Sequence, residues 1–464
     1  MQKLLWVMLV LVLTVGLILS GCSSTSTPSS TTSAPTTSAT AAPTTSATVP
    51  TSSQTQKVLK IGAVVPLNMA EGIEIQKWMN LFAKMYNEKG GWKIGNDTYQ
   101  VQIEVEDGGY SDLAKSRSAA EKLILQDGVK FLVSSWGDIP AQTITITEPN
   151  KVLDIGCDFT DGTAAPGLNY FIRGSGVYFG QAMNYVIDKD AVAKGAKTYL
   201  VVGPDNARIK VACAHMNATA TVAGLNPLDV LYFSSDTVDF SPLATKIKSL
   251  NPDVVDLGYT GGDQGLNLMS ALIDAGYKGI IQPGNMTQTT IDNAVKKLGK
   301  DFMEGKETGS FDPTGMQKDP DMLALIDSYT KEYGSFHSDG CMWVTPWFFF
   351  QDAVNSTQSV DVDVLAKYLQ NSTHGVKCLT GYAQLFARPD LQNFKTIDVA
   401  IGNYVGIIKD GKLVSSKTDS VKDQYLVSIK SYSLVDVYQK YWDQYGKPQF
   451  PQEPSLFDFA DLTK

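Results

Sequence analysis

The chain has 464 residues, with 39 Lys and Arg against 48 Asp and Glu, and a net charge of −9. This acidic balance argues against nucleic acid as a partner, and against a basic patch that holds anionic lipid. The length beyond the first 56 residues is enough for two globular domains.

The first residues have the layout of a secretory signal. Lys3 supplies one positive charge, and residues 4–19 are almost wholly apolar. The segment ends at Leu19-Ser20-Gly21-Cys22, which resembles the bacterial lipoprotein box, where the cysteine thiol takes a diacylglycerol. An uncleaved transmembrane anchor is the alternative, because the apolar run approaches spanning length. We expect a signal peptide over 1–21 and a chain outside the cytoplasm, anchored to the cell membrane by a lipid on Cys22.

The next segment is a tether. Residues 23–56 are almost entirely Ser, Thr, Ala and Pro, without a charge or an aromatic ring. Such a composition cannot bury enough apolar surface to offset the entropy of ordering. The predicted tether, 22–56, would hold the next domain roughly 30–35 Å from the bilayer, at about 5–6 Å × √n for flexible chain.

Buried strands then alternate with amphipathic helices. The expected strands of a first lobe are 59–66, 99–105, 129–133 and 152–156, separated by helices near 78–85, 112–126 and 140–148. Gly90-Gly91 and Asp107-Gly108-Gly109 break the pattern. Parallel strands need crossovers long enough to hold a helix, so the alternation predicts a doubly wound sheet.

The same pattern restarts at residue 198. Further strands are expected at 198–202, 228–233, 254–257 and from 280 onward. Ser241-Pro242 predicts a helix start, with a capping hydroxyl followed by the residue best tolerated at the first helical position. Gly276 is expected to end the next helix.

Periodicity lapses around 304–312. Helices are expected at 322–333 and 342–354, antiparallel strands across 404–429 with a turn at Asp410-Gly411, and an aromatic-rich helix at 433–445. The predicted class is α/β with two doubly wound lobes. The expected division is 57–180 for lobe 1, 181–306 for lobe 2, 307–430 for a return to lobe 1 and the closing segments of lobe 2, and 431–464 for a C-terminal helix and tail.

Catalytic and metal-binding patterns are absent from the sequence. It contains three histidines, with no HExxH, CxxC, GxSxG or Walker motif, so neither a metal nor another cofactor is expected. Asp205, Asp236 and Asp239 stand where strands end or helices begin, which suits capping carboxylates. A tethered hydrolase that uses Cys157 as its nucleophile is the alternative from the enzyme class.

Four cysteines follow Cys22 in a compartment where disulfides form. They are Cys157, Cys213, Cys341 and Cys378. Cys341 with Cys378 is the preferred pair, because both flank predicted helix ends. Spacing alone leaves the connectivity open.

Polar and aromatic residues gather in the loops after the predicted strands. In open α/β sheets, ligands bind at the carboxyl ends of strands, where the winding reverses. The loops there are Asn68-Met69, Ser134-Ser135-Trp136, Cys157-Asp158-Phe159, Asp205-Asn206, Tyr259-Thr260 and Asn285-Met286. Hydroxyls and amides can fix the head of a ligand, and rings can cover its body.

Several stretches in order resemble one family. They are Lys60–Leu67, Asn87–Gly91, Val105–Asp107, Phe171–Arg173, Asp239–Leu243 and Asn251–Val255. From about residue 57 to 430 the chain resembles the type I periplasmic solute-binding proteins of ABC importers, in the branch that binds branched-chain amino acids. The resemblance implies two lobes, joined by three crossings, that close on a small solute and present it to an ABC permease with its ATPase subunits.

The resemblance also implies a set of ligand-binding residues. Ser134 and Ser135 match serines that hold a ligand carboxylate, although simple helix capping is their alternative role. Cys157 lies where the family often has a small residue, and Asp205-Asn206-Ala207 lacks the family's tyrosine. The full set is Ser134, Ser135, Trp136, Cys157, Asp158, Phe159, Tyr178, Asn206, Tyr259, Thr260, Asn285 and Met286.

Asn285 stands at or near the acid that pairs with a ligand ammonium in amino-acid binders. A buried ammonium without a carboxylate is costly. Two hypotheses follow: a carboxylate ligand without an α-amino group, stacked on Trp136, Phe159 or Tyr259, or a cationic or zwitterionic ligand for which Asp158 replaces the lost acid. Packing within a lobe is the alternative role for Trp136 and Phe159.

The expected protein is a monomeric binding protein rather than an enzyme. Its expected partners are a small-molecule solute, the permease with its ATPase subunits, and the membrane through the lipid. An extracytoplasmic ligand sensor of the same fold is the alternative.

Overall fold

A computed structural model describes most of the chain beyond residue 56. The described residues are 57–110, 112–137, 139–158, 168–173, 183–258, 260, 262–284, 286–310, 312–371, 375–387, 397–401, 403–419, 427, 430, 431 and 434. The predicted signal, Cys22, the tether and nearly all of the predicted helix at 433–445 lie outside this set. Within the described part, no helix has the length and apolar character needed to cross a membrane.

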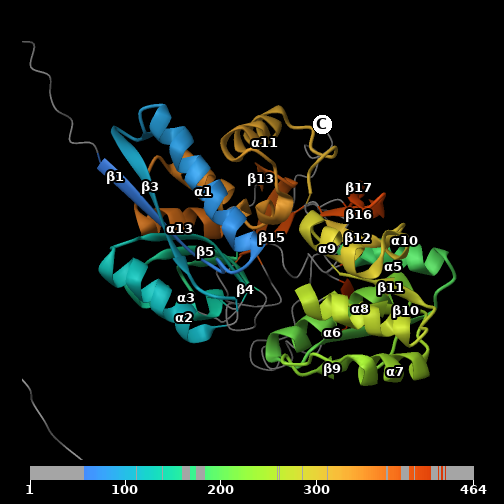
Figure 1. Cartoon of the computed structure of the whole chain (residues 1–464). Coiled ribbons are helices and arrows are strands. Elements are labelled where there is room, and N and C mark those ends of the chain that lie inside the picture. The colour runs from blue at the N-terminus through green and yellow to red at the C-terminus, as the bar shows by residue number, and fades with distance from the viewer. Residues whose placement is uncertain are drawn as a thin grey trace, which may run out of the picture. The chain divides into compact units, whose positions relative to one another are not determined.

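Lobe 1 is built on a six-stranded sheet with the order β2-β3-β1-β4-β5-β6 (Figure 1). Its strands are β1 (Lys57–Val65), β2 (Trp92–Ile94), β3 (Asp97–Asp107), β4 (Phe131–Gly137), β5 (Leu153–Asp158) and β6 (Phe171–Arg173). All neighbours pair in parallel except β2 with β3. This confirms the predicted doubly wound sheet.

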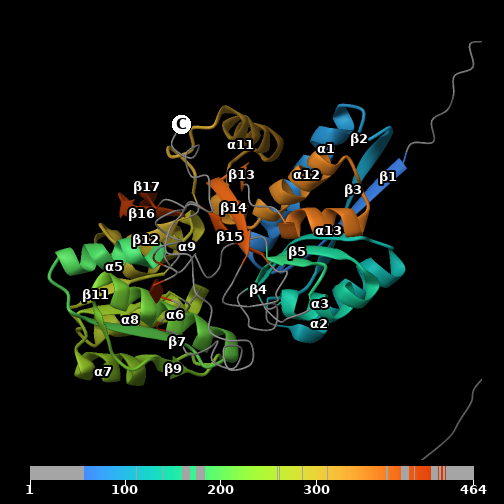
Figure 2. The ribbon, with the colours of Figure 1, turned by 180° about the vertical axis from the view of Figure 1, so that it is seen from behind.

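Helices cover both faces of this sheet. They are α1 (Ala70–Glu88), α2 (Leu113–Glu121), the π-helical turn η1 (Lys122–Gln126), α3 (Ile139–Asn150), α11 (Pro320–Tyr333), the 3-10 turn η3 (Ser338–Gly340), α12 (Thr345–Thr357) and α13 (Val362–Asn371). Figure 2 shows α12 and α13 on the α1 side of lobe 1. Alternate residues of β1 face two separate cores, with Ile61 and Ala63 on one side and Val64 on the other.

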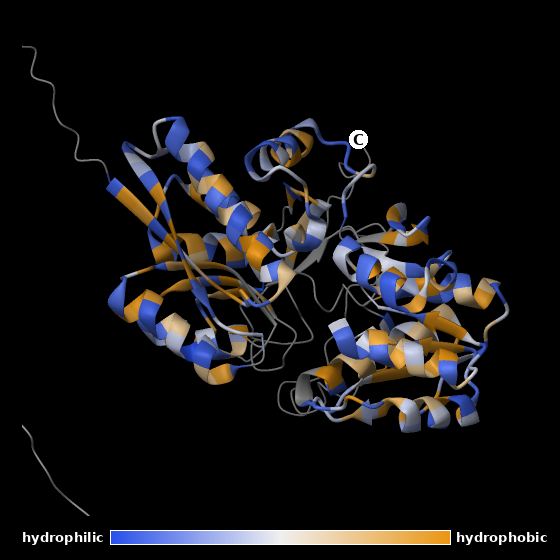
Figure 3. Cartoon of the chain, viewed as in Figure 1, coloured by the Kyte–Doolittle hydropathy of each residue, from blue (hydrophilic) through white to orange (hydrophobic). Residues whose placement is uncertain are grey.

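Aromatic rings fill the larger of the two lobe 1 cores. The ring centroid of Phe82 in α1 lies 4.9 Å from that of Trp347 in α12, and that of Trp78 lies 4.4 Å from Tyr329 in α11. Segments far apart in sequence therefore share one core. Ring pairs of this kind stabilise the fold beyond what the buried area alone provides. Figure 3 shows blue and orange residues alternating around the turns of α1, as expected for a helix with one buried face.

Lobe 2 is built on a second parallel sheet. Its order is β11-β10-β7-β8, and β9 also pairs with β7. The strands are β7 (Thr198–Pro204), β8 (Asn226–Pro227), β9 (Leu231–Phe233), β10 (Val254–Asp256) and β11 (Ile280–Gln282). The helices are α5 (Met183–Ala193), α6 (Ala207–Ala223), α7 (Ser241–Leu250), α8 (Gly262–Asp274), α9 (Gln288–Leu298) and α10 (Lys300–Met303).

Two antiparallel sheets complete the described fold. β12 (Glu307–Ser310), β16 (Asn403–Lys409) and β17 (Lys412–Asp419) form one, and β13 (Gly375–Cys378), β14 (Gly381–Ala387) and β15 (Ile397–Ile401) form the other. The predicted turn at Asp410-Gly411 is confirmed, with φ angles of 53° and 73°. β12 was not expected, because the sequence of this strand lacks the apolar alternation of the others.

The start of α7 differs from the prediction in one respect. Pro242 stands in the first turn as expected, but the residue before the helix is Phe240, and Ser241 is already helical. The carboxylate of Asp239 accepts from the Ser241 N–H at 2.9 Å. The capping oxygen therefore comes from Asp239, a residue whose capping role was predicted.

The predicted disulfide is wrong. The structure contains no disulfide among Cys157, Cys213, Cys341 and Cys378. Cys341 and Cys378 both lie in the larger lobe 1 core, where burial raises the pKa of each thiol and keeps it protonated. These two cysteines serve as small apolar core residues.

Candidate functional site

The carboxyl ends of β4 and β5 bring the lobe 1 candidates together. The two strands are parallel, and their register places Trp136 beside Cys157 and Gly137 beside Asp158, with a shift after Val133. Ser134, Ser135 and Trp136 therefore lie at the same edge of the sheet as Asp158. The side chains of these four residues, and all of Phe159 and Tyr178, lie outside what the structure describes.

Cys157 turns away from that edge. Its side chain is fully buried in the larger lobe 1 core, on the same face of β5 as Leu153 and Ile155. Alternation along a strand explains this orientation, because every second side chain points to one face. The geometry therefore supports neither ligand contact by Cys157 nor its use as an accessible nucleophile.

In lobe 2, the corresponding edge carries a tight turn after β10. We call Leu257, Gly258 and Thr260 the β10 turn. It is closed by the Thr260 N–H, which donates to the Leu257 carbonyl at 2.7 Å, and the Thr260 hydroxyl donates to the Val202 carbonyl at 3.1 Å. Thr260 is therefore buried and holds the turn to β7. Tyr259, the candidate ring in this turn, lies outside the described residues.

The segment after β11 packs directly on the β10 turn. Gly284 has a φ of +79°, and a Cβ at this position would lie 2.8 Å from the Cα of Gly258. Only a glycine fits here, because both the backbone angle and the space exclude a side chain. Gly258 and Gly284 are thus direct neighbours, while Tyr259 and Asn285, which follow them in the sequence, lie outside the described residues.

Met286 and Thr308 fix the far end of the same segment. The Met286 N–H donates to the Thr308 hydroxyl at 3.0 Å, and that hydroxyl donates to the Gly284 carbonyl. The Met286 side chain is buried in a lobe 2 core. Its predicted ligand contact is therefore replaced by a packing role in this structure.

Asn206, a predicted ligand contact, caps α6. Its side-chain oxygen accepts from the Ile209 N–H at 2.9 Å, and the residue is exposed. This is the geometry of an ordinary N-cap. The carboxylate of Asp205 pairs with Lys210 at 2.6 Å.

Two buried carboxyl groups lie at the root of the β10 turn. Asp256 is the last residue of β10, and its carboxylate accepts from the Tyr199 hydroxyl at 2.6 Å and from the Gly258 N–H at 2.7 Å. Asp188 of α5 accepts from Gln282 Nε2 at 3.0 Å. Both carboxyl groups are almost fully buried.

Burial dominates the electrostatics of this pair. It raises the pKa of Asp256 to about 6, against the lowering effect of its hydrogen bonds from Tyr199 and Gly258. Burial, and then the charge of Asp256, raise the pKa of Asp188 well above its ordinary value. As the pH falls, Asp188 therefore takes up a proton before Asp256 does. Asp256 is the ionised member of the pair at neutral pH.

Sequence reasoning missed Asp256, Asp188 and Thr308. A signal existed for Asp256, because a charged residue interrupts the otherwise apolar run from Val254 to Leu257. No sequence signal marked Asp188 or Thr308, because α5 and β12 contact the loops after β10 and β11 only in the folded protein. Among the described residues, no group of three or more His, Cys, Asp or Glu side chains could hold a metal ion.

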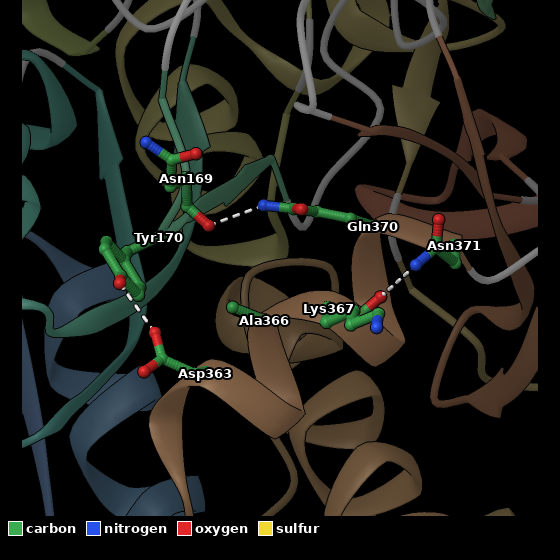
Figure 4. A pocket seen from close by; sticks show the side chains of 7 residues that line it. All are labelled: Asn169, Tyr170, Asp363, Ala366, Lys367, Gln370 and Asn371. Atoms are coloured by element: carbon green, nitrogen blue, oxygen red, sulfur yellow. Dashed lines mark hydrogen bonds between the residues drawn. The ribbon is translucent and has the colours of Figure 1, made fainter.

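A polar pocket lies elsewhere on lobe 1 (Figure 4). It has a volume of about 500 Å³ and is lined by Asn169, Tyr170, Asp363, Ala366, Lys367, Gln370 and Asn371. The Tyr170 hydroxyl donates to Asp363 at 2.6 Å. Tyr170 precedes β6, so the pocket lies at the amino end of the sheet, opposite the edge that carries the candidates. No predicted site residue lines it.

Comparisons with known proteins bear on both lobes. The sequence profile of a family described as periplasmic binding protein matches residues 59–395. The chain is 25% identical over 236 residues to the Leu/Ile/Val-binding protein homolog 6 of Brucella melitensis biotype 1. That match covers 50% of this chain, and the chain spans about three fifths (59%) of the length of the relative.

Solved structures show the same fold. A leucine binding protein from Thermotoga maritima superposes with a TM-score of 0.64 at 18% identity, covering 79% of this chain and 100% of that one. A solute binding protein of an ABC transporter from R. palustris, in complex with benzoate, superposes with a TM-score of 0.61 at 16% identity, covering 78% and 96%. The chain therefore shares the fold of these proteins, with the two α/β lobes described above.

Proposed function

The chain belongs to the periplasmic binding protein family, and we propose that it captures a small carboxylate outside the cytoplasm and delivers it to the permease of an ABC importer. The observation that carries this proposal is the extent of the family match, which spans both parallel sheets and the candidate edges of each. The family is one of binding proteins, so the chain acts by binding rather than by catalysis. The proposed boundaries are 57–180 for lobe 1, 181–306 for lobe 2 and 307–430 for the returning segments.

The proposed ligand is an amino acid or an aromatic carboxylate. Similar proteins are described as binding leucine, in one case, and as complexed with benzoate, in another. In the proposed site, Ser134 and Ser135 hold the carboxylate, while Trp136, Phe159, Tyr178 and Tyr259 supply the rings. The two sheet edges close on the ligand as the lobes move together.

Ligand identity is tested with the purified protein. Small molecules released by denaturation are identified by mass spectrometry, and L-leucine and benzoate are each added in a thermal unfolding series. A ligand at a hundred times its dissociation constant is expected to stabilise the fold by about 2.7 kcal/mol. Absence of any released carboxylate, together with unchanged unfolding in both series, would contradict the proposed function.

Asp158 distinguishes the two classes of ligand. If its carboxylate replaces the acid missing at Asn285, Asp158→Asn weakens the binding of L-leucine by on the order of tenfold or more and leaves benzoate unaffected. Asp205→Asn is the matched control, because Asp205 is exposed and pairs with Lys210. Equal leucine affinity in wild type and Asp158→Asn would end the hypothesis that Asp158 replaces the lost acid.

We also propose that a lipid on Cys22 holds the protein at the membrane near its permease, with 22–56 as the tether. Cys22→Ala is expected to release the chain from the membrane fraction, because a diacylglycerol supplies the apolar contact that anchors it. The measurement is the distribution of the protein between membrane and soluble fractions, with Ser23→Ala as control. A Cys22→Ala protein that is still cleaved normally and stays in the membrane fraction would refute the anchor.

A further inference from the structure

The carboxylate of Asp256 lies where β10 ends and the β10 turn begins. Three groups donate to it: the Tyr199 hydroxyl at 2.6 Å, the Gly258 N–H at 2.7 Å and the Asn184 side-chain amide at 3.2 Å. They come from β7, from the turn itself and from α5. One buried carboxylate therefore joins a strand, a helix and the turn.

The other bonds of the turn involve groups that do not titrate. The Leu257 N–H donates to the Gln282 carbonyl at 2.9 Å, and Thr260 is held by the Leu257 and Val202 carbonyls. The bond from the Gly258 N–H to Asp256 is different, because its acceptor carries a charge. Hydrogen bonds to an ionised acceptor are roughly twice as strong as neutral ones.

Gly258 cannot move freely from this position. A Cβ at Gly258 would lie 2.5 Å from Met216 Cε and 3.0 Å from Asp256 Oδ1, and its Cα closely approaches Gly284. The Gly258 N–H is thus held against Asp256 from both sides. Loss of the bond from the Gly258 N–H to Asp256 would therefore affect both the β10 turn and the segment after β11, which carry predicted ligand contacts.

The titratable groups that face Asp256 are Asp188 from α5, Tyr199 from β7 and Cys213 from α6. None of these three is a cation, so among the described residues the charge of Asp256 is stabilised by hydrogen bonds rather than by an ion pair. Asp188 has a second carboxyl oxygen that is buried without a hydrogen-bond partner. A neutral Asp188 suits that position, which leaves the negative charge on Asp256.

We propose that Asp256 is a positioning residue for ligand binding, and that its ionised carboxylate holds the β10 turn in the conformation that receives the ligand. The inference rests on the proposed function, which places this turn at the ligand. Acidification then weakens the turn and the affinity together. The pKa of Asp256, raised to about 6 by burial, sets the range of pH in which this occurs.

The test begins without any ligand. Hydrogen exchange of peptides that span residues 257–262 is measured by mass spectrometry at pH 8 and pH 5, corrected for the intrinsic exchange rate. In the wild type, protection of these peptides is expected to fall several-fold at pH 5, while peptides from β1 keep theirs. In Asp256→Asn, the turn is expected to show the lower protection at both pH values, because the acceptor is neutral.

Asp188→Asn is the matched control, since it neutralises a buried acid in the same cluster that makes no bond to the turn. It is expected to keep both the wild-type protection at pH 8 and its loss at pH 5. Protection in Asp256→Asn equal to wild type at pH 8, or an equal loss in Asp188→Asn, would overturn the proposal. The pH profile of the wild type alone decides it if a variant fails to fold.

Binding gives an independent reading. Affinities for L-leucine and benzoate are measured at pH 8 and pH 5, and whichever probe binds is expected to lose several-fold more affinity on acidification in the wild type than in Asp256→Asn. A pH dependence equal in both proteins would overturn the link to the ligand. If neither probe binds at pH 8, the proposed ligand class fails, while hydrogen exchange still decides the role of Asp256 in the turn.

Discussion

At the scale of single residues, Asp188 shows how an acid can be buried without a cation. Its carboxyl group has one hydrogen bond, from Gln282, and one oxygen without a partner. Burial and the charge of Asp256 raise its pKa well above the ordinary value of 3.8. The folded state therefore keeps a proton that the unfolded state has already lost at neutral pH. The stability from this group is full below pH 3.8 and is lost as the pH rises toward the raised value.

Asp188→Asn removes this dependence. The free energy of unfolding of the variant, relative to wild type, is expected to rise progressively from pH 5 to pH 8, reaching on the order of 1–3 kcal/mol. The measurement is urea unfolding at several pH values. Asp274→Asn, at an exposed position of α8, serves as the control. Parallel pH curves for Asp188→Asn and wild type would contradict the expectation.

The candidate site was only partly predictable at this scale. The rule that ligands bind at the carboxyl ends of strands selected the segments that the register brings together, such as Trp136 with Cys157. It could not say which side chains in those segments face inward. Cys157 and Met286 are buried in the cores because of strand alternation and of packing between segments distant in sequence. Asn206 was predicted as a contact, but it forms a local helix cap.

At the scale of elements, strands with local signals were predicted and strands without them were missed. β7 and β10 can be recognised in the sequence as apolar runs between turn residues. β12 has the sequence Glu-Thr-Gly-Ser, and its partner is β16, with Glu307 opposite Ile407. Its pairing is fixed by contacts distant in sequence, so no local pattern marks it.

α5 illustrates how one helix joins two sheets of lobe 2. Asp188 faces β11, whereas Asp190 pairs with Lys417 of β17. Lys417 Nζ also lies 3.4 Å from Glu307 of β12, whose side chain is 14% exposed, and Lys194 of α5 lies 3.0 Å from the same carboxylate. Partial burial opposes the ionisation of Asp190, but hydrogen bonds led by that from Lys417 outweigh it and lower its pKa. The four charges form a network between α5 and the antiparallel sheet.

Lys417→Met is expected to lower the free energy of unfolding by on the order of 1 kcal/mol at low salt, because it leaves two carboxylates without a cation they share. The loss should shrink at high salt. Lys412→Met is the matched control on the same strand, since Lys412 and its partner Asp292 are exposed and 3.8 Å apart. Unfolding in urea at two salt concentrations measures both variants. Equal losses in the two would show that the network adds nothing to an ordinary surface pair.

At the scale of the whole molecule, the chain passes between the lobes three times. β1 to β6 form lobe 1, and α5 to β12 belong to lobe 2. The segment from α11 to β15 returns to the lobe 1 core, and β16 joins the lobe 2 core through Ile408. Each lobe therefore has its own hydrophobic core, and each core contains residues from segments far apart in the sequence. The restart of the strand–helix alternation at residue 198 predicted two lobes, and the resemblance implied the three crossings between them.

This arrangement makes a specific prediction for a ligand that contacts both lobes. L-leucine or benzoate, whichever binds, is added at about a hundred times its dissociation constant, and hydrogen exchange is followed along the chain. A ligand held by both edges protects peptides that contain residues 134–137 and peptides that contain residues 257–260 together, because neither edge can open without losing the ligand. Peptides from β8, at the border of the lobe 2 sheet, serve as the reference. Protection confined to one edge would mean that the ligand binds a single lobe, and capture by closure of the two lobes would then be wrong for this protein.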